Sequence, residues 1–172
     1  SYEVGDDELD GIVGQFIDYV RDGRDEPLQT VDLVSMLQTL AADEARRGRE
    51  WRLGLPGSAR SQGRPLALRR ALTNLLDNAA RHGAAPFEVE LDAIEDGWRL
   101  RVFDRGPGVP ETALAALGRP FHRVDGARST PGSGLGMASV ARIAVVHGGE
   151  LRLRNRGGGG LVAELFIGVL PR

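Results

Sequence analysis

The first stretch of this chain that carries chemistry is Thr73-Asn74-Leu75-Leu76-Asp77-Asn78-Ala79-Ala80-Arg81-His82-Gly83, in a predicted helix. On a helix that turns about 100° per residue, Asn74, Asn78 and Arg81 fall within about 60° of one another. The apolar residues lie opposite, so the polar stripe is predicted to face away from the core. Amide oxygens ligate Mg²⁺ without repelling phosphates, and an arginine adds charge for a phosphate. Solvated residues on an amphipathic helix would show the same stripe.

A second polar group follows a predicted strand that ends at Phe103, where residues 104–108 read Asp-Arg-Gly-Pro-Gly. A carboxylate only accepts hydrogen bonds, and in a pocket Asp104 would accept one from the exocyclic amine of adenine. Gly106 and Gly108 would let the backbone approach the base closely. Taken alone, the segment is equally typical of an ordinary turn.

A third candidate is a glycine-rich segment at the start of a predicted helix. It consists of Gly132, Ser133, Gly134, Leu135 and Gly136. Exposed backbone amides and the positive end of a helix form an anion site, so a triphosphate could lie here. A Rossmann motif is excluded, because the spacing is Gly-x-Gly-x-Gly and the preceding residues are polar instead of forming a buried strand.

Apolar periodicity along the chain predicts a two-layer α/β sandwich, in which helices cover one face of a mixed sheet. The predicted strands cover residues 30–33, 51–55, 87–91, 98–102, 150–154 and 161–169. The predicted helices cover residues 36–48, 65–83, 111–117 and 135–147. Residues 56–64 are rich in Gly, Ser and Pro and predict a loop. Residues 118–131 show neither period and predict a mobile loop.

The N-terminal region predicts one further helix. Its apolar seam, spaced by four, three and four residues, runs through Leu9, Val13, Phe16 and Val20. Gly23 and Pro27 end this pattern, so we expect one unit at residues 1–26 and a second at residues 27–172. Ser1 is not an initiator methionine, and the chain looks like a piece of a longer protein.

Composition excludes several classes of protein. The chain has 172 residues and a net charge of -2, which fits a single core and argues against a nucleic-acid partner. It contains no cysteine, which excludes thiolate zinc sites and fits the cytoplasm. All 22 basic residues are arginines, so P-loop, Ser/Thr-kinase and pyridoxal chemistries lack their lysine. No run of about 20 apolar residues occurs.

In this order, the three segments resemble the N, G1 and G2 boxes of the GHKL ATPase superfamily. Residues 119–123, Arg-Pro-Phe-His-Arg, resemble its F box. Residues 15–21 look like the second dimerisation helix of osmosensor-type sensor histidine kinases. The resemblance covers essentially the whole chain, and it implies the Bergerat fold with ATP and Mg²⁺ as cofactors.

The resemblance also implies roles for individual residues. Asn78 would ligate Mg²⁺ with help from Asn74, and Asp104 would bind the adenine amine. Arg81 and His82 would contact phosphate or ribose. Two glycines would shape the adenine pocket, namely Gly106 and Gly108. Residues 132–136 would wrap the triphosphate.

Residues 118–131 would form the lid over ATP. Phe121 would anchor the lid, and Arg123 and Arg128 would be available to the γ-phosphate. Gyrase-like and chaperone-like members of the superfamily carry a glutamate that activates water at the position of Asn74. Because an amide cannot act as a general base, phosphoryl transfer to a protein is favoured over hydrolysis.

The implied function is the catalytic step of a two-component system. The ATP γ-phosphate would pass to a histidine and then to the receiver domain of a response regulator. The acceptor motif is not found around His82, His122 or His147, so the chain is predicted not to phosphorylate itself. The full protein would be a homodimer with its own phosphoacceptor domain, anchored in the inner membrane. The alternatives are a degenerate interaction module and another GHKL kinase or ATPase.

Overall fold

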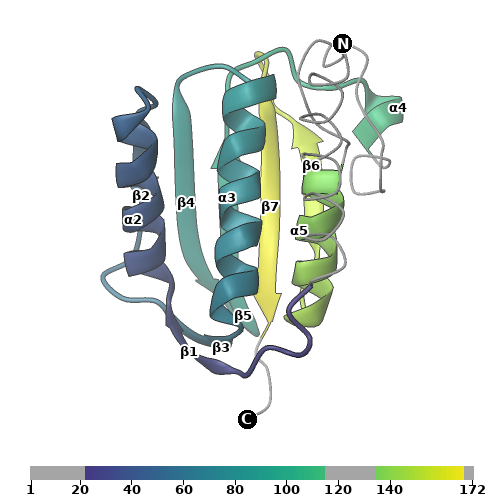
Figure 1. The fold of residues 1–172 in the computed structure, drawn as a ribbon. Helices are drawn as coiled ribbons and strands as arrows, with labels where there is room; N and C mark the ends of the chain where they lie inside the picture. The colour runs from purple at the N-terminus through teal and green to yellow at the C-terminus, as the bar shows by residue number, and fades with distance from the viewer. Residues whose placement is uncertain (1–21, 115–134, 169–172) are drawn as a thin grey trace, which may run out of the picture.

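The computed structural model describes residues 22–114 and 135–168 (Figure 1). Its helices are α2 (Leu33–Arg46), α3 (Pro65–His82), α4 (Glu111–Leu114) and α5 (Leu135–Val146). Its strands are β1 (Gln29–Asp32), β2 (Trp51–Gly54), β3 (Arg60–Gly63), β4 (Phe87–Ile94), β5 (Gly97–Phe103), β6 (Leu151–Asn155) and β7 (Leu161–Gly168). Apart from residues 22 and 23, the predicted N-terminal helix lies outside the described residues, as does the predicted loop at 118–131.

Five strands form the main sheet, in the order β2-β4-β5-β7-β6. β2 runs parallel to β4, whereas the other neighbouring strands are antiparallel, so the sheet is mixed as predicted. Both predicted hairpins are present. Leu91 faces Leu100 in the first hairpin, and Leu153 faces Ala163 in the second.

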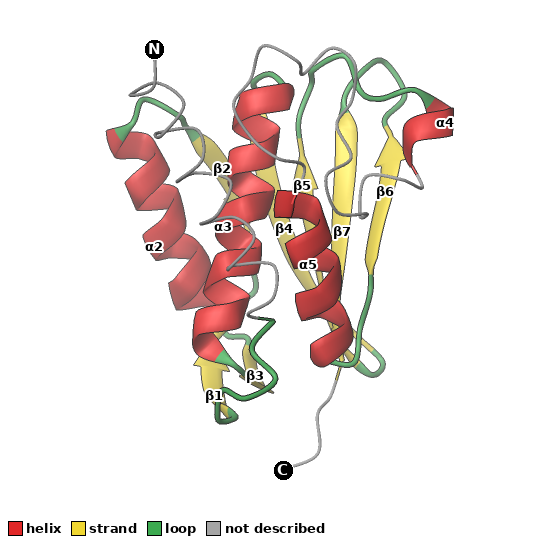
Figure 2. Cartoon of the chain, turned by 45° about the vertical axis from the view of Figure 1, so that its right-hand side comes forward, coloured by secondary structure: helices red, strands yellow, loops and turns green. Residues whose placement is uncertain are grey.

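Helices α2, α3 and α5 lie on one face of this sheet (Figures 1 and 2). α3 turns its apolar side towards the strands and buries Leu68, Leu72 and Leu75. β4 meets it with the buried half of its alternation, which includes Val89 and Leu91. Burial of one such side chain stabilises the fold by about 1.5–3 kcal/mol. The predicted two-layer sandwich is confirmed, and no described helix has the length and apolar character of a membrane span.

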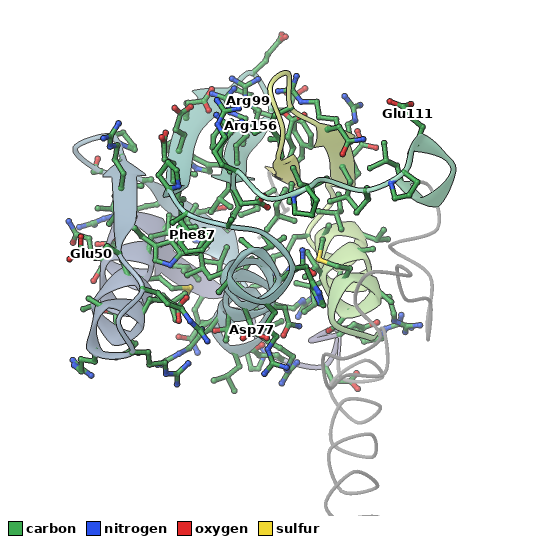
Figure 3. The ribbon with its side chains drawn as sticks, turned by 90° about the horizontal axis from the view of Figure 1, so that it is seen from above. Glu50, Asp77, Phe87, Arg99, Glu111 and Arg156 are labelled. Atoms are coloured by element: carbon green, nitrogen blue, oxygen red, sulfur yellow. The ribbon has the colours of Figure 1, made fainter. Side chains whose placement is uncertain are left out.

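The opposite face of the main sheet carries ion pairs between neighbouring strands. Arg99 pairs with Asp92 at 2.7 Å, and Arg101 pairs with Glu90 at 2.8 Å. Seen from above, Arg99 lies on the far side of the sheet from Asp77 of α3 (Figure 3). Such partly exposed pairs contribute only about 0–1 kcal/mol each. Their charge keeps this face solvated, which is why the fold has two layers and not three.

The predicted loop at residues 56–64 is wrong in its second half. Residues 60–63 form β3, which pairs antiparallel with β1. Ser61 and Gln62 show no apolar alternation, so the periodicity rule could not detect this strand. It is held by its backbone ladder, by a hydrogen bond from Gln62 Nε2 to Thr30 Oγ1 at 2.9 Å, and by one from Trp98 Nε1 to the Arg60 carbonyl at 3.3 Å.

Residues 22–26, here called the entry segment, pack on the domain through a buried acid. Asp22 is 2% exposed, and its carboxylate binds Arg24 at 2.8 Å and Arg142 of α5 at 2.9 Å. Burial acts to raise the pKa of Asp22, but hydrogen bonds from these two arginines outweigh it and lower the pKa to about 2. The entry segment is thereby fixed to α5.

The entry segment also caps α3. Glu26 accepts hydrogen bonds from the backbone N–H groups of Leu66 and Ala67 at 2.7 and 3.1 Å. Arg64, the residue before the helix, makes no side-chain cap of its own. A carboxylate at a helix N-terminus satisfies orphan N–H groups and interacts favourably with the helix dipole. The boundary expected after residue 26 stays a prediction, but residues 22–26 are bound to the second unit.

The Asp22→Asn variant is expected to lose about 1 kcal/mol of unfolding free energy, because a charged acceptor of two arginines becomes neutral. Since the pKa of Asp22 lies at about 2 in the fold, the loss should be constant between pH 5 and pH 8. Urea denaturation measures it. Asp25→Asn, which changes an exposed acid of the same segment, should unfold like the wild type. Equal losses in the two variants would contradict the assignment.

His147 ties the end of α5 to the start of α3. The residue is 0% exposed, and its Nε2 accepts the backbone N–H of Arg64 at 3.0 Å. Its Nδ1 lies 2.8 Å from the carbonyl oxygen of Ile143. Because Nε2 is an acceptor, the ring proton sits on Nδ1 and the imidazole is neutral. Burial lowers the pKa of His147.

Acidification is expected to destabilise the fold through His147. Between the lowered pKa of the fold and the ordinary pKa of about 6.5, the unfolded chain binds a proton that the folded chain does not. Unfolding free energy should therefore fall as the pH drops below about 6.5. In the His147→Gln variant, the shift of the urea midpoint between pH 7.5 and pH 5.5 should be smaller than in the wild type. An equal shift would exclude His147 as its source.

Candidate functional site

The three candidate segments meet around the C-terminal half of α3. Asn74 Nδ2 donates to the carbonyl oxygen of Gly136, in the first turn of α5, at 3.4 Å. At the other end, the backbone N–H of Arg105 donates to the carbonyl of Ala84 at 2.8 Å. α3 is thus in contact with the start of α5 and with residues 104–109, here called the G1 loop.

Asp104 is the buried acid of this site, with 4% of the residue exposed. Its Oδ1 accepts the backbone N–H of Gly106 at 2.8 Å. Burial raises the pKa of Asp104, and backbone hydrogen bonds and the charge of Arg156 offset this only in part. The backbone hydrogen bonds that stabilise its charged form come from Gly106 and Leu161. An ionised carboxylate only accepts hydrogen bonds, so this buried acid fits a ligand that donates an N–H, as the adenine amine does.

Gly83 and Gly106 bring the end of α3 against this acid. A Cβ atom at Gly83 would lie 2.3 Å from Asp104 Cγ, and one at Gly106 would lie 2.6 Å from the Cα of Gly83. The φ of Gly83 is -103°, so close packing and not backbone conformation requires a glycine there. The sequence indicated Gly83 only as the stop of a helix; the structure places it beside the carboxylate.

The two asparagines of the polar stripe lie on the side of α3 that reaches α5. Asn74 and Asn78 are both half-buried, and His82 is exposed at the end of the helix. In the part of the chain that the structure describes, no group of three or more His and acidic residues could hold a metal. A Mg²⁺ ion here would therefore depend on amide oxygens together with phosphate oxygens, which are suitable hard ligands.

The side chain of Arg81 forms an ion pair with Asp77, one turn earlier on the same helix. Its Nε lies 2.9 Å from Asp77 Oδ2, and Asp77 Oδ1 lies 4.0 Å from Arg49, which follows α2. The structure thus keeps Asn74 and Asn78 together but turns the guanidinium of Arg81 towards α2.

The glycine-rich segment is described only from its fourth residue. Leu135 begins α5, and Gly136 is half-buried beside Asn74. The remaining predicted site residues lie outside the described ranges: Gly132, Ser133, Gly134, Phe121, Arg123 and Arg128. Their roles stay predictions.

A known protein family matches the part of the chain that contains this site. The model of the family described as histidine kinase-, DNA gyrase B- and HSP90-like ATPase matches residues 63–170, which include α3, the G1 loop and α5. The chain belongs to this family. The mixed sheet with helices on one face is the fold of these ATPase domains, and ATP as the bound nucleotide follows from the family.

Relatives of this ATPase domain are sensor histidine kinases. GtrS of Pseudomonas aeruginosa is 39% identical over 165 residues, which cover 94% of this chain and 33% of GtrS. The chain therefore spans about a third of the length of the curated relatives it matches. Among solved structures, the mycobacterial sensor histidine kinase MprB has a TM-score of 0.71 at 29% identity, covering 85% of this chain and 100% of that one.

The histidine kinase domain of the Escherichia coli osmosensor EnvZ is a further structural relative. It has a TM-score of 0.66 and 35% identity, over 85% of this chain and 91% of that one. These likenesses identify the ATPase domain as the ATP-binding catalytic domain of a sensor histidine kinase, as the sequence predicted.

Two further residues of the ATPase domain touch the G1 loop and were not predicted. The side chain of Asn155 binds Val109, and the side chain of Arg156 binds the carbonyl of Asp104. Arg156 is 52 residues from Asp104 in sequence. In the sequence, these two residues stand out only by their position between a predicted strand and four glycines. The predicted hairpin already accounted for that pattern, so it did not indicate a role in the site.

Proposed function

We propose that this domain binds Mg²⁺-ATP and donates the γ-phosphate to a histidine on a separate phosphoacceptor domain, from which a response regulator receives it. The observation that carries the proposal is Asp104, a buried carboxylate in the G1 loop that lies against Gly83 at the end of α3. Buried acids with a raised pKa are concentrated at functional sites, and this one lies beside the end of α3.

The proposal assigns one end of ATP to the G1 loop and the other to α3. Asp104 accepts from the adenine amine, while Gly106 and Gly108 form the backbone wall of the base pocket. Asn78, helped by Asn74, offers amide oxygens to Mg²⁺. Arg81 and His82 serve phosphate or ribose, and Arg81 leaves Asp77 to do so.

The remaining phosphate contacts are assigned to residues 118–136. Arg123 and Arg128 approach the γ-phosphate, Phe121 anchors the lid, and the glycines before α5 wrap the triphosphate with backbone N–H groups. A bound Mg²⁺ would neutralise phosphate charge during transfer.

Asn74 supports transfer to a protein over hydrolysis. Its amide cannot remove a proton from water, and its Nδ2 donates to the Gly136 carbonyl, so its polar contact serves to join α3 to α5. The acceptor histidine is then outside these 172 residues, since the acceptor motif does not surround any of the three histidines present.

The wider protein is proposed to work as a two-component sensor kinase in the cytoplasm, with an anchor in the inner membrane. Its partners are its own dimerisation and phosphoacceptor domain, a second copy of itself and the receiver domain of a response regulator. The names of the similar proteins, which are sensor histidine kinases, support the sensor-kinase part of this proposal.

Calorimetric titration with ADP and with a non-hydrolysable ATP analogue, each with and without Mg²⁺, tests the proposal. Binding that strengthens with Mg²⁺ is expected. Incubation with ATP should yield no acid-labile phosphohistidine on the chain and no steady ATP turnover. Absence of nucleotide binding would favour an interaction module, and steady turnover would favour an ATPase.

A further inference from the structure

The G1 loop is held at its far end by the side-chain amide of Asn155, the last residue of β6. Asn155 Nδ2 donates to the carbonyl of Val109 at 2.6 Å, and Asn155 Oδ1 accepts the N–H of Val109 at 2.9 Å. This two-way pair needs a donor and an acceptor on one side chain, which an amide supplies and a carboxylate does not. Gly108 makes room for it, because a Cβ there would lie 2.6 Å from Asn155 Oδ1.

The near end of the loop is held by Arg156. Its Nη1 donates to the carbonyl of Asp104 at 2.9 Å, and its guanidinium carbon lies 4.9 Å from the ring centroid of Phe103. The stacked ring restricts the guanidinium plane, so the donor stays aimed at the backbone of Asp104. Arg156 thus contacts both Phe103, the last residue of β5, and Asp104, the residue that follows it.

Residues 156–160, here called the glycine turn, complete this contact. Arg105 Nη1 donates to the carbonyls of Gly157 and Gly159 at 3.0 and 3.1 Å. Gly160 has a φ of +113°, and a Cβ there would lie 2.1 Å from the Asp104 carbonyl oxygen. An arginine side chain of each segment therefore donates to backbone carbonyls of the other, so the glycine turn and the G1 loop hold each other in place.

We propose that Asn155 and Arg156 are positioning residues for adenine recognition. By fixing Val109 and Asp104, they hold the G1 loop in its binding geometry before the nucleotide arrives, so that binding costs little conformational entropy. The inference rests on the proposed function, because it gives Asp104 the adenine amine as its ligand.

A comparison of ATP with inosine triphosphate separates positioning from general stability. Inosine triphosphate carries a ring carbonyl in place of the amine and an N–H at N1, so the ratio of the two dissociation constants reports on how the pocket reads this edge of the base, where Asp104 is proposed to bind. A correctly placed carboxylate should give the wild-type chain a preference for ATP of about 10–100-fold. Damage to the whole fold would weaken both nucleotides equally and leave this ratio unchanged.

In the Asn155→Asp and Arg156→Gln variants, the preference for ATP is expected to fall below about threefold, since the loop ends are released. Arg152→Gln is the matched control. Arg152 lies on the same strand with its guanidinium carbon 5.0 Å from the Phe166 ring, and the described contacts do not include one to the G1 loop. That variant should keep the wild-type ratio.

Thermal melting shows whether each variant is folded at the titration temperature. If Arg156→Gln is not, Arg156→Lys carries the test, because it keeps the charge but loses the planar fork, and its ratio should be intermediate. Wild-type ratios in the folded variants would overturn the positioning role and leave the proposed function intact. A wild-type chain without preference for ATP would overturn both.

Discussion

The Asp104→Asn variant is expected to bind ATP about 10–100-fold more weakly than the wild type and yet to melt at a higher temperature. Oδ1 of Asp104 already accepts the Gly106 N–H, so the asparagine oxygen takes over that bond. Its NH₂ group then meets the adenine amine, and two donors face each other. Calorimetry for binding and scanning calorimetry for melting measure the two effects.

The gain in stability has a separate physical cause. Because burial raises the pKa of Asp104, its ionised form costs stability at pH 7, and a neutral amide does not. The contribution of this group is favourable below its unfolded pKa and is lost as the pH rises through the raised folded pKa. The difference in melting temperature should therefore shrink as the pH falls towards 4.

Asp22→Asn is the matched control for this result. Both acids are buried, but the carboxylate of Asp22 binds two arginines and that of Asp104 binds none. The same chemical change should thus destabilise the fold at one position and stabilise it at the other. A lower melting temperature for Asp104→Asn would show that its charge is compensated, and unchanged ATP affinity would remove Asp104 from the site.

The Gly83→Ala variant is expected to lose about 1–3 kcal/mol of unfolding free energy and at least about tenfold in ATP affinity. The added methyl would lie 2.3 Å from Asp104 Cγ and 2.7 Å from the carbonyl of Ala79, so the carboxylate must shift or the end of α3 must open. Either movement displaces the carboxylate oxygen that is proposed to accept from the adenine amine. Urea denaturation and titration with ADP measure the two losses.

Gly57→Ala is the control, because no atom lies within 4 Å of its added Cβ and its φ is not positive. It should leave both properties close to wild type. In an Asp104→Ala background, the cost of Gly83→Ala should decrease, since the nearest clashing group is gone. The same cost in both backgrounds would mean that the clash with Ala79 dominates.

The sandwich was predictable where apolar residues repeat with a clear period. α3, β4 and β5 each bury one side and expose a charged one, so their patterns were unambiguous. β3 was missed because it pairs mainly through backbone groups with a strand about 30 residues earlier, and its side chains are polar. Long-range backbone pairing leaves no mark on local hydrophobicity.

The site was predictable as segments but not as contacts. Asn74, Asp104 and Gly136 belong to motifs that their residue types mark, and the fold brings those motifs together. The direction of Arg81 depends on Asp77 and on Arg49 beyond α2, and the roles of Gly83 and Arg156 depend on distances of a few ångströms. Such choices are made by tertiary packing, which spacing along the chain does not encode.

The entry segment binds two helices of the domain, α5 and α3. Asp22 forms an ion pair with Arg142 of α5, and Glu26 accepts hydrogen bonds from the first turn of α3. α3 has 18 residues, so at a rise of about 1.5 Å per residue its C-terminal end lies about 27 Å from its start. The entry segment therefore joins α3 and α5 at the end of α3 that is far from Asn78. A substitution in the entry segment is therefore expected to act on both helices that carry the candidate site.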